Sequence, residues 1–557
     1  MTFEERLAGW GRGWRGPVLA AVVALVAGLP GLIAIPPLDR DEARFAQASA
    51  QMLESGDFVT IHFQDTPRFK KPVGIYWLQA AAVAALSHVE DRHIWAWRVP
   101  SLLGAMLAAA ACAWGAAAFL GPGGALMAGA MLGASTLLST EAAIAATDAI
   151  LCGATTLAMA ALGRVHLAAR GGPPAGWRSK LIFWLGLSLS ILVKGPIGPM
   201  IVALTLLALG LWERRVAWLK DLGWGWGLLL VLAVVGPWAL AITVATDGAF
   251  WGASIGGDLA PKLAGDQEGH GAPPGFHLAL LPLLLFPASL LLPAGAVTAW
   301  RARAEPAVRF ALCWLIPSWL VFEAAPTKLV HYPLPLYGAL AWLMARALAE
   351  PAGRPSRWIG ALMVALAGAA LAVAGPLAMA GLHDWSGAAW GWAAAVLFLA
   401  AGGAAAVRLL SGSAPQAVAL GIAGMLAAHG VFAACLVPAL RPLWLSSRAA
   451  GALAAAGLSP RQGIAPGPVT VAGYEEPSLV FLLGTATELG DANDAAAAIS
   501  EGRPAIVEGR LDGAFHAALA RDGVTAQRVG EGAGLDYSNN RPDILRIYRP
   551  PPERASP

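Results

Sequence analysis

The sequence predicts an α-helical protein that crosses a membrane many times and ends in a small α/β domain. Charged residues make up 13% of the chain, whereas soluble domains carry about 25%. Hydrophobic residues make up 57%, and the mean hydropathy is +0.60. Long apolar runs recur as far as residue 438, after which short apolar and polar segments alternate. The net charge of +3 gives no reason to expect a nucleic-acid partner.

The long apolar runs predict thirteen membrane-spanning helices, since each span needs roughly 20 apolar residues. The first follows Arg6, Arg12 and Arg15, which resemble the start of a signal peptide but precede no clear cleavage site. The fifth and sixth are short and share the break Lys194-Gly195-Pro196. The expected spans are 17–37, 98–119, 125–142, 148–167, 180–194, 196–212, 225–246, 276–299, 309–325, 332–349, 357–379, 388–409 and 416–438.

The distribution of basic residues predicts how the helices are oriented. Every longer loop on one side of the predicted bundle carries arginine or lysine, so the positive-inside rule places that side in the cytoplasm. The opposite side then holds two long loops, residues 38–97 and 246–275. The apolar run Pro72–His88 should form an interfacial helix in the first loop, because another span would put the basic loops outside. The basic residues of the inner loops are Arg164, Arg170, Arg178, Lys180, Arg214, Arg215, Lys220, Arg301, Arg303, Arg309, Arg346, Arg354, Arg357 and Arg408.

The composition changes near residue 440, which divides the chain into a membrane domain, residues 1–439, and an α/β domain, residues 440–557. An odd number of spans places the second domain outside, in the periplasm of a Gram-negative cell. It has no glycine-rich phosphate loop, histidine cluster or nucleophile elbow, so we expect no chemistry there. Its expected strands and helices are Val469–Tyr474, Ser478–Leu483, Ala492–Ser500, Ala505–Glu508, Gly513–Arg521, Val524–Val529 and Ile544–Tyr548.

The first long loop begins with a densely charged stretch, Leu38–Leu78, which so apolar a chain does not need for folding. Asp41 stands directly after the first span. We expect it to be a general base in a cavity at the membrane surface, because partial burial raises the pKa of a carboxyl group. Asp39 and Glu42 are expected to cap a helix over Glu42–Leu53. Asp39 and Asp41 also have the spacing of a metal-binding DxD pair, which alone is a weak indication.

Several cations are predicted on the same outer face, against the positive-inside trend. Each could simply anchor the chain at the membrane surface. Together they indicate a bound anion, and the phosphate of a polyprenyl carrier suits lysine and arginine. Asp148 stands at the outer end of a span, where a carboxylate is costly and is a candidate functional residue. The cations are Arg44, Lys70, Lys71, Arg98, Lys194 and Lys328.

Short motifs along the whole chain are similar to a known family. They are Asp41–Ala46, Met52–Asp57, Lys71-Pro72, Tyr76-Trp77, Arg98-Val99-Pro100, Thr147-Asp148, Lys194-Gly195-Pro196, Pro237-Trp238, Lys328–Pro335, Glu476–Phe481 and Tyr537–Asn540. This series resembles the lipid-linked sugar transferases of the GT-C class. Within that class it is similar to the aminoarabinose transferase (ArnT-like) and protein O-mannosyltransferase group, glycosyltransferase families 39 and 83.

The resemblance implies an inverting glycosyltransferase of the bacterial inner membrane whose active site faces the periplasm. It would move a sugar from an undecaprenyl-phosphate carrier to lipid A or the lipopolysaccharide core, with a protein acceptor as the alternative. We expect Asp41 and Asp148 to be catalytic, and Lys71 and Arg98 to contact the lipid phosphate. The expected substrate-binding residues are Glu42, Arg44, Lys70, Lys71, Tyr76, Arg98, Lys194, Lys328, His331 and Tyr332.

One position departs from the family pattern. Aminoarabinose transferases carry an acidic residue, implicated in a metal site, where this chain has Lys70. A divalent metal near the lipid phosphate therefore stays open. Lys70 would either replace the charge of the metal or contact an acidic sugar such as a uronic acid. The outer histidines His62, His270, His277 and His331 match no zinc motif.

Two other classes of protein remain as alternatives to an enzyme. A transporter or flippase for the lipid-linked sugar would carry charges near the centres of its spans, whereas the polar residues here gather at one face. An assembly scaffold acting through the C-terminal domain would leave the charged first loop unexplained.

Overall fold

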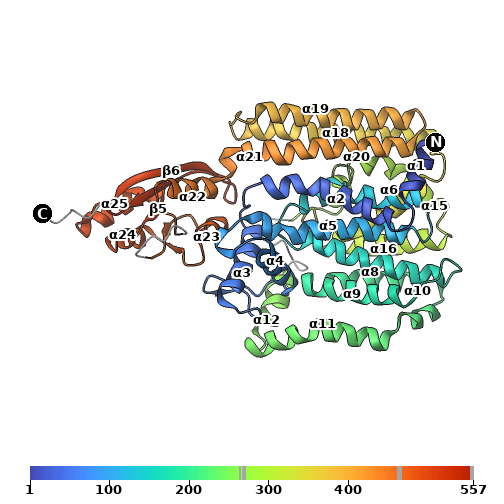
Figure 1. Cartoon of the computed structure of the whole chain (residues 1–557), viewed down its shortest axis with the longest axis horizontal. Helices are drawn as coiled ribbons and strands as arrows, with labels where there is room; N and C mark the ends of the chain where they lie inside the picture. The colour runs from blue at the N-terminus through green and yellow to red at the C-terminus, as the bar shows by residue number, and fades with distance from the viewer. Residues whose placement is uncertain (262–264, 266–270, 461–466, 552–557) are drawn as a thin grey trace.

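The described part of the computed structural model, residues 1–261, 265, 271–460 and 467–551, is mostly helical. Figure 1 shows long helices lying side by side along the molecule, with a small sheet domain at one end. Eight helices of these residues are long and apolar enough to span a membrane, so the chain is a multi-pass membrane protein, as predicted. They are α2 (Arg15–Ala34), α5 (Ile94–Ala116), α8 (Asp148–Ala168), α11 (Trp224–Ala245), α16 (Pro306–Ala324), α18 (Arg354–Gly381), α19 (Ala388–Leu410) and α20 with its continuation (Ala414–Ala439).

Eight is fewer than the thirteen spans expected, and the difference lies in five short, charged or bent segments. Helices α6, α10 and α17 have 12, 17 and 11 residues, whereas a straight span needs roughly 20. Helix α9 carries three basic residues. Helix α14 meets η4 and α15 at a bend of 113°, which makes at most a ninth span. The bounds are α6 (Pro122–Gly133), α9 (Trp177–Lys194), α10 (Ile197–Glu213), α14 (Phe276–Leu284), η4 (Ala288–Leu291), α15 (Leu292–Arg301) and α17 (Tyr337–Ala347).

Small residues let α5 and α8 approach closely. A Cβ atom added at Gly104 of α5 would lie 2.6 Å from the Cα atom of Ile150 in α8. Gly153 of α8 faces the backbone of Gly104 in turn. Helices in membranes associate through such close backbone packing. The contact holds the first turn of α8, which begins at Asp148, against α5.

The first long loop folds into α3 (Asp41–Ser55), strands β1 (His62–Phe63) and β2 (Thr66–Pro67), and α4 (Gly74–Leu86). Helix α4 has 13 residues, too few for a span, which agrees with the helix predicted inside this loop. It packs against α3 and α5. The second long loop begins with α12 (Ala249–Trp251) and η3 (Gly252–Leu259). Its residues 262–264 and 266–270, including His270, lie outside the described residues.

The C-terminal domain has the α/β fold that its alternating pattern predicts. Its five-stranded sheet has the order β4-β3-β5-β7-β6, in which β3 runs parallel to β4 and β5, and β7 runs antiparallel to β5 and β6. The elements are α22 (Leu445–Ala455), β3 (Thr470–Ala472), α23 (Pro477–Leu483), β4 (Glu488–Gly490), α24 (Ala492–Ser500), β5 (Ala505–Glu508), η9 (Gly509–Leu511), α25 (Asp512–Arg521), β6 (Gln527–Asp536) and β7 (Arg541–Arg549).

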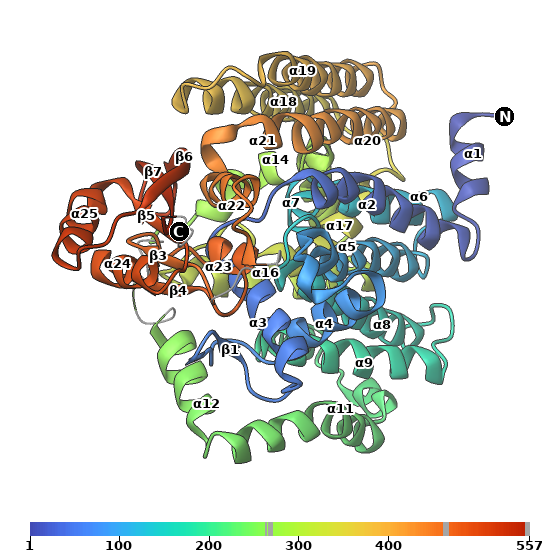
Figure 2. The same cartoon turned by 60° about the vertical axis from the view of Figure 1, so that its left-hand side comes forward.

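The C-terminal domain lies at the same end of the bundle as the first long loop. Figures 1 and 2 place α23 of this domain beside α3, and the two helices are in contact. Phe481 of α23 packs edge-on against Trp97 of α5, with ring centroids 5.1 Å apart. The shorter elements that complete the chain are α1 (Phe3–Trp10), η1 (Val89–Asp91), α7 (Thr136–Glu141), η2 (Ala217–Leu222), η5 (Leu334–Leu336), η6 (Phe432–Leu436), α21 (Val437–Ala439) and η7 (Arg441–Leu443).

Candidate active site

A cavity of about 810 Å³ opens where the first long loop meets the start of α8 and the end of α9. This volume lies within the roughly 300–1,000 Å³ of small-molecule sites. Most of its wall is apolar, and charged side chains converge on it. Seven of the twelve site residues predicted from the sequence line it: Asp41, Lys70, Lys71, Asp148, Lys194, His331 and Tyr332.

Asp41 is the first residue of α3, and its carboxylate faces the cavity. The side chain is 72% exposed, so the partial burial expected for it is not observed. The guanidinium groups of Arg68 and Arg44 lie 3.8 Å and 3.9 Å from Oδ1. The carboxylate is therefore open to a ligand in the cavity, and two guanidinium groups lie beside it.

Arg68 is a residue that the sequence did not single out. Its side chain is 9% exposed, and its guanidinium group lies 5.2 Å from the centroid of the Phe45 ring. Its buried Nε has no hydrogen-bond partner among the described residues. No pattern in the sequence distinguishes Arg68 from the other charges of the loop, because its burial depends on α3 folding over it.

Asp148 and Lys194 form an ion pair at the cavity wall. Asp148 begins α8 and Lys194 ends α9, and the Lys194 Nζ donates to Asp148 Oδ1 at 2.6 Å. Gly195 ends α9 with φ 58° and ψ −119°, a backbone conformation that favours glycine. The break predicted at this point thus turns the chain away and leaves Lys194 at the cavity. Lys194 Nζ also lies 5.6 Å from the centroid of the Tyr332 ring.

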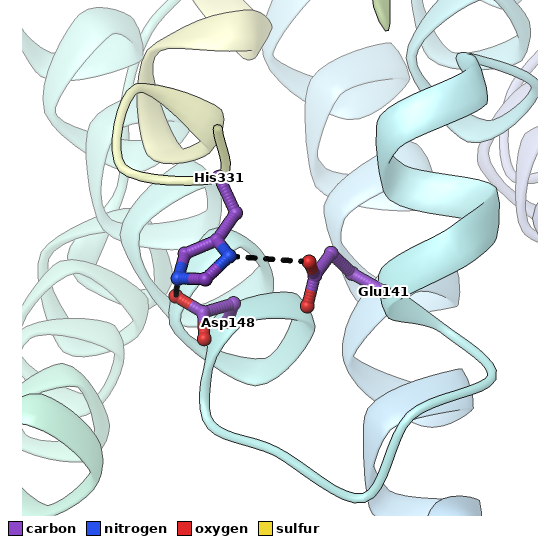
Figure 3. A group of neighbouring side chains, drawn as sticks. All are labelled: Glu141, Asp148 and His331. Atoms are coloured by element: carbon purple, nitrogen blue, oxygen red, sulfur yellow. Dashed lines mark ion pairs between the residues drawn. The ribbon is translucent and has the colours of Figure 1, made fainter. Parts of the chain in front are cut away.

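His331 lies between two carboxylates (Figure 3). Its Nδ1 is 3.3 Å from Glu141 Oε1, and its Nε2 is 3.6 Å from Asp148 Oδ1. Burial alone lowers the pKa of His331, but the charges of Asp148 and Glu141 outweigh it and raise this pKa above its ordinary value. Glu141 was missed by the sequence analysis. The available signal was a carboxylate within a predicted span, which is unusual in membrane helices.

Glu141, Asp148 and His331 form one candidate group of metal ligands among the described residues, with ligand atoms within 4.8 Å of one another. Two carboxylates and an imidazole suit a divalent metal. However, the Lys194 ammonium group already contacts Asp148, and the raised pKa favours an imidazolium, which cannot bind a metal. At Lys70, where the resemblance implies an acidic residue of a metal site, an ammonium group offers no metal ligand. These residues do not fit a resident metal.

Glu42 and Arg98 do not line the cavity but form a buried ion pair. Arg98 is fully buried and donates five hydrogen bonds, two to Glu42 and three to the carbonyls of Leu32, Ile35 and Pro36. Glu42 also accepts hydrogen bonds from the backbone N–H groups of Leu38 and Ala145. All five guanidinium donors are thus used inside the protein. This placement gives Arg98 no free donor for the lipid phosphate and gives Glu42 no face toward a substrate.

Three further predicted residues also lie outside the cavity wall. Lys328 is buried, and its Nζ donates to the carbonyls of Ala272 and Ala325 at 2.7 Å and 2.6 Å, so it joins the end of the second loop to the end of α16. Tyr76 is buried against Phe45, with ring centroids 5.5 Å apart. Arg44 is half-buried and reaches the site only through Asp41.

The expected helix cap at Asp39 is wrong. Helix α3 begins after Arg40, and no side chain caps its first turn. Asp39 instead accepts a hydrogen bond from the Ser478 Oγ of the C-terminal domain. The sequence pattern for a cap was present, but Ser478, far along the chain, donates a hydrogen bond to this carboxylate instead.

Comparisons with known proteins show what the chain as a whole resembles. Residues 38–250 match the family model described as Dolichyl-phosphate-mannose-protein mannosyltransferase. An undecaprenyl phosphate-alpha-4-amino-4-deoxy-L-arabinose arabinosyl transferase of Pseudomonas paraeruginosa is 30% identical over 329 residues, 58% of either chain. Its namesake in Pectobacterium carotovorum is 29% identical over 312 residues, 55% of this chain and 54% of the relative. The alignments thus span a little over half the length of these relatives.

The fold is also found among solved structures. The crystal structure of ArnT from Cupriavidus metallidurans bound to undecaprenyl phosphate gives a TM-score of 0.75 at 20% identity, covering 95% of this chain and 97% of that chain. The apo structure of the same protein gives a TM-score of 0.72 at 21% identity, with the same coverage. The chain therefore has the fold of the ArnT structures, as the resemblance predicted, and its residues 38–250 match the mannosyltransferase family model.

Proposed function

We propose that this protein is an inverting glycosyltransferase of the bacterial inner membrane. It transfers a sugar from an undecaprenyl-phosphate carrier to lipid A or the lipopolysaccharide core on the periplasmic side. The observation that carries the proposal is a single cavity that joins the open carboxylate of Asp41 to the ammonium groups of Lys70, Lys71 and Lys194. The names of the relatives and of the ArnT structure support the donor class.

In the proposed reaction, an acceptor oxygen attacks the anomeric carbon of the sugar while the bond to the phosphate oxygen breaks on the opposite face. Asp41 accepts the proton of the attacking hydroxyl group, a step that the exposure of its carboxylate allows. The leaving polyprenyl phosphate is already a stable anion. Lys70 and Lys71 hold it by charge, so the protein mainly orients the two substrates.

The cluster of Asp148, Lys194, His331 and Glu141 would position the sugar. Its carboxylates can accept hydrogen bonds from sugar hydroxyl or amino groups, and Lys194 can donate to ring or hydroxyl oxygens. Undecaprenyl phosphate carrying 4-amino-4-deoxy-L-arabinose is the first donor to test, because the relatives carry its name. A uronic-acid donor is the second, because Lys70 adds a positive charge to the cavity wall.

The test uses the full-length protein in liposomes with lipid-linked donor and lipid A. The expected product is lipid A heavier by one sugar, detected by mass spectrometry. Asp41→Asn should abolish transfer, whereas Asp65→Asn, an exposed carboxylate of the same loop away from the cavity, should not. Full transfer by Asp41→Asn would refute the mechanism.

The same assay separates the alternatives. A flippase would move the labelled donor across the bilayer without forming any glycosylated product. A protein O-glycosyltransferase would leave lipid A unmodified and label a protein acceptor instead. Mass spectrometry of lipid A, core oligosaccharide and envelope proteins from a strain that lacks the protein would identify the acceptor directly.

A further inference from the structure

The backbone that leads into Asp41 is held by the C-terminal domain. The Asp39 N–H donates to Tyr537 Oη at 2.5 Å, and the Asp39 carboxylate accepts from Ser478 Oγ. Arg40 Nη2 donates to the carbonyl oxygen of Ser538 at 2.6 Å. The two residues directly before Asp41 thus have partners more than 400 positions away in the sequence.

The conformation of Arg40 explains why this turn needs external partners. Its φ of 60° and ψ of −113° lie in a region that non-glycine residues rarely adopt. At the break after α9, the chain makes nearly the same turn with Gly195, at φ 58° and ψ −119°. Glycine adopts this conformation without a steric penalty, whereas arginine does not. Contacts from outside the turn must therefore stabilise it at Arg40.

The C-terminal domain also forms hydrogen bonds with residues farther along α3. The Gln47 side-chain amide donates to Thr485 Oγ1, and Thr485 Oγ1 donates to Glu54 Oε2, both at 2.6 Å. The Gln64 side chain of the first loop donates to the carbonyls of Thr485 and Thr487. The domain therefore binds α3 on two of its turns in addition to the residues that precede it.

We propose that Tyr537 and Ser478 are positioning residues of the glycosyl transfer, which fix the turn at Asp39 and Arg40 and thereby set the orientation of the Asp41 carboxylate. The inference rests on the proposed function of Asp41. It gives the C-terminal domain, in which the sequence indicates no chemistry, a role in the reaction. A displacement of about 1 Å in a reacting group can lower a rate roughly 100-fold, so a turn that is held loosely would be costly.

The proposal also predicts a dependence on pH. Burial raises the pKa of Asp39 to about 7, the Ser478 hydrogen bond opposes this shift, and the charges of Glu476 and Asp536 add to it. Tyr537 and Tyr474 also face this carboxylate, while Arg40 and Arg44 act on Glu476. Below pH 7 Asp39 is neutral. As the pH rises through 7, Asp39 gains a negative charge beside two other carboxylates. The repulsion between them weakens the contacts of Tyr537 and Ser478 with the turn.

The test measures kcat, the KM for the donor and the pH profile of full-length variants in liposomes. Tyr537→Phe and Ser478→Ala should each lower kcat about tenfold and change the donor KM less than twofold, because the lysines of the cavity are untouched. Tyr548→Phe is the matched control, since the Tyr548 hydroxyl donates to Asp512 elsewhere in the same domain. It should leave kcat unchanged. Asp39→Asn should remove the fall in kcat above pH 7.

The outcomes separate this proposal from the proposed function. If Asp41→Asn is inactive while Tyr537→Phe and Ser478→Ala keep wild-type kcat, the positioning role is refuted and the glycosyltransferase stands. If Asp41→Asn is fully active, the mechanism itself fails. Tyr537→Phe keeps the ring and its packing, so it carries the test should Ser478→Ala not insert into the membrane. An equal loss of kcat in Tyr548→Phe would show a general effect of the domain and overturn the proposal.

Discussion

The two ends of helix α8 both carry buried ionic clusters, but the clusters differ in what they leave open. At its last turns, His166 and the guanidinium groups of Arg170 and Arg309 all contact Glu213. The Glu213 side chain is 2% exposed, and no residue of this cluster lines the large cavity. At the first residue of α8, Asp148 pairs with Lys194 and His331, and all three line the cavity.

The difference shows how position along one helix separates stability from function. The 21 residues of α8 span roughly 30 Å, about the thickness of the hydrocarbon core of a bilayer. Around Glu213 one carboxylate is surrounded by its partners, so the cluster joins α8, α10 and α16. Around Asp148 the charges meet at a cavity wall, where a substrate can compete for them. Mutations at the first residue of α8 should therefore lower catalysis, whereas mutations at its last turns should lower stability.

Asp148→Asn should lower catalysis more than any substitution in the Glu213 cluster. It removes the charge that pairs with Lys194 and His331, so both would reorient in the cavity. We expect kcat to fall about 100-fold, the lower range for loss of a positioned catalytic carboxylate. The unfolding temperature in detergent should stay within a few degrees. If the variant loses stability but keeps its turnover per folded molecule, Asp148 stabilises the fold as Glu213 does and has no role in catalysis.

Glu213→Gln should lower the stability of the protein and leave its turnover unchanged. It leaves the partly buried guanidinium groups of Arg170 and Arg309 without their counter-charge. Because both groups are partly exposed, the cost should lie below the about 3–5 kcal/mol of a fully buried pair. Thermal unfolding of the purified protein should show this loss directly. Turnover per folded molecule should remain that of the wild type, because the cluster lies far from the cavity. A drop in kcat without a drop in stability would contradict the comparison.

The contrast also shows what the sequence could and could not predict. Hydropathy predicted the fold class, the eight long helices and the start of α8 at Asp148, because these depend on local composition. The sequence singled out every ionisable residue of the cavity wall except Glu141. The thirteen expected spans exceed the eight helices that length and composition support among the described residues, because short helices such as α6 are apolar as well.

Predictions about partners failed where the partner is distant in the sequence. Arg98 looked like a phosphate ligand, but the last turn of α2 and the loop after it present three carbonyls to it, and Glu42 accepts its remaining hydrogen bonds. Asp39 looked like a helix cap, but its carboxylate accepts a hydrogen bond from Ser478 instead. A local pattern specifies what a side chain is able to do, whereas tertiary packing decides which of its possible partners reaches it.

A smaller effect is expected from pH through His331. Because Asp148 and Glu141 raise its pKa, His331 stays protonated at and below its ordinary pKa and loses its proton only as the pH rises above that value. The cavity then loses one positive charge, so the KM for the anionic donor should rise about threefold at alkaline pH. His331→Gln should remove this change in KM. The fall in kcat that we assign to Asp39 should persist in this variant, which distinguishes the two groups.

A similarly small effect is expected at Lys70, which lies at the cavity wall but outside both ionic clusters of α8. Lys70→Glu restores the acidic residue of the aminoarabinose transferases and removes a cation. It should raise the KM for the donor about threefold and make transfer respond to added divalent cations, measured with and without a chelator. If Lys70 contacts an acidic sugar, Lys70→Glu should also lower the preference for a uronic-acid donor over the aminoarabinose donor. Unchanged donor preference and metal response would show that the Lys70 charge is only a surface feature. Function would then rest on Asp41, Lys71 and the cluster at the first residue of α8.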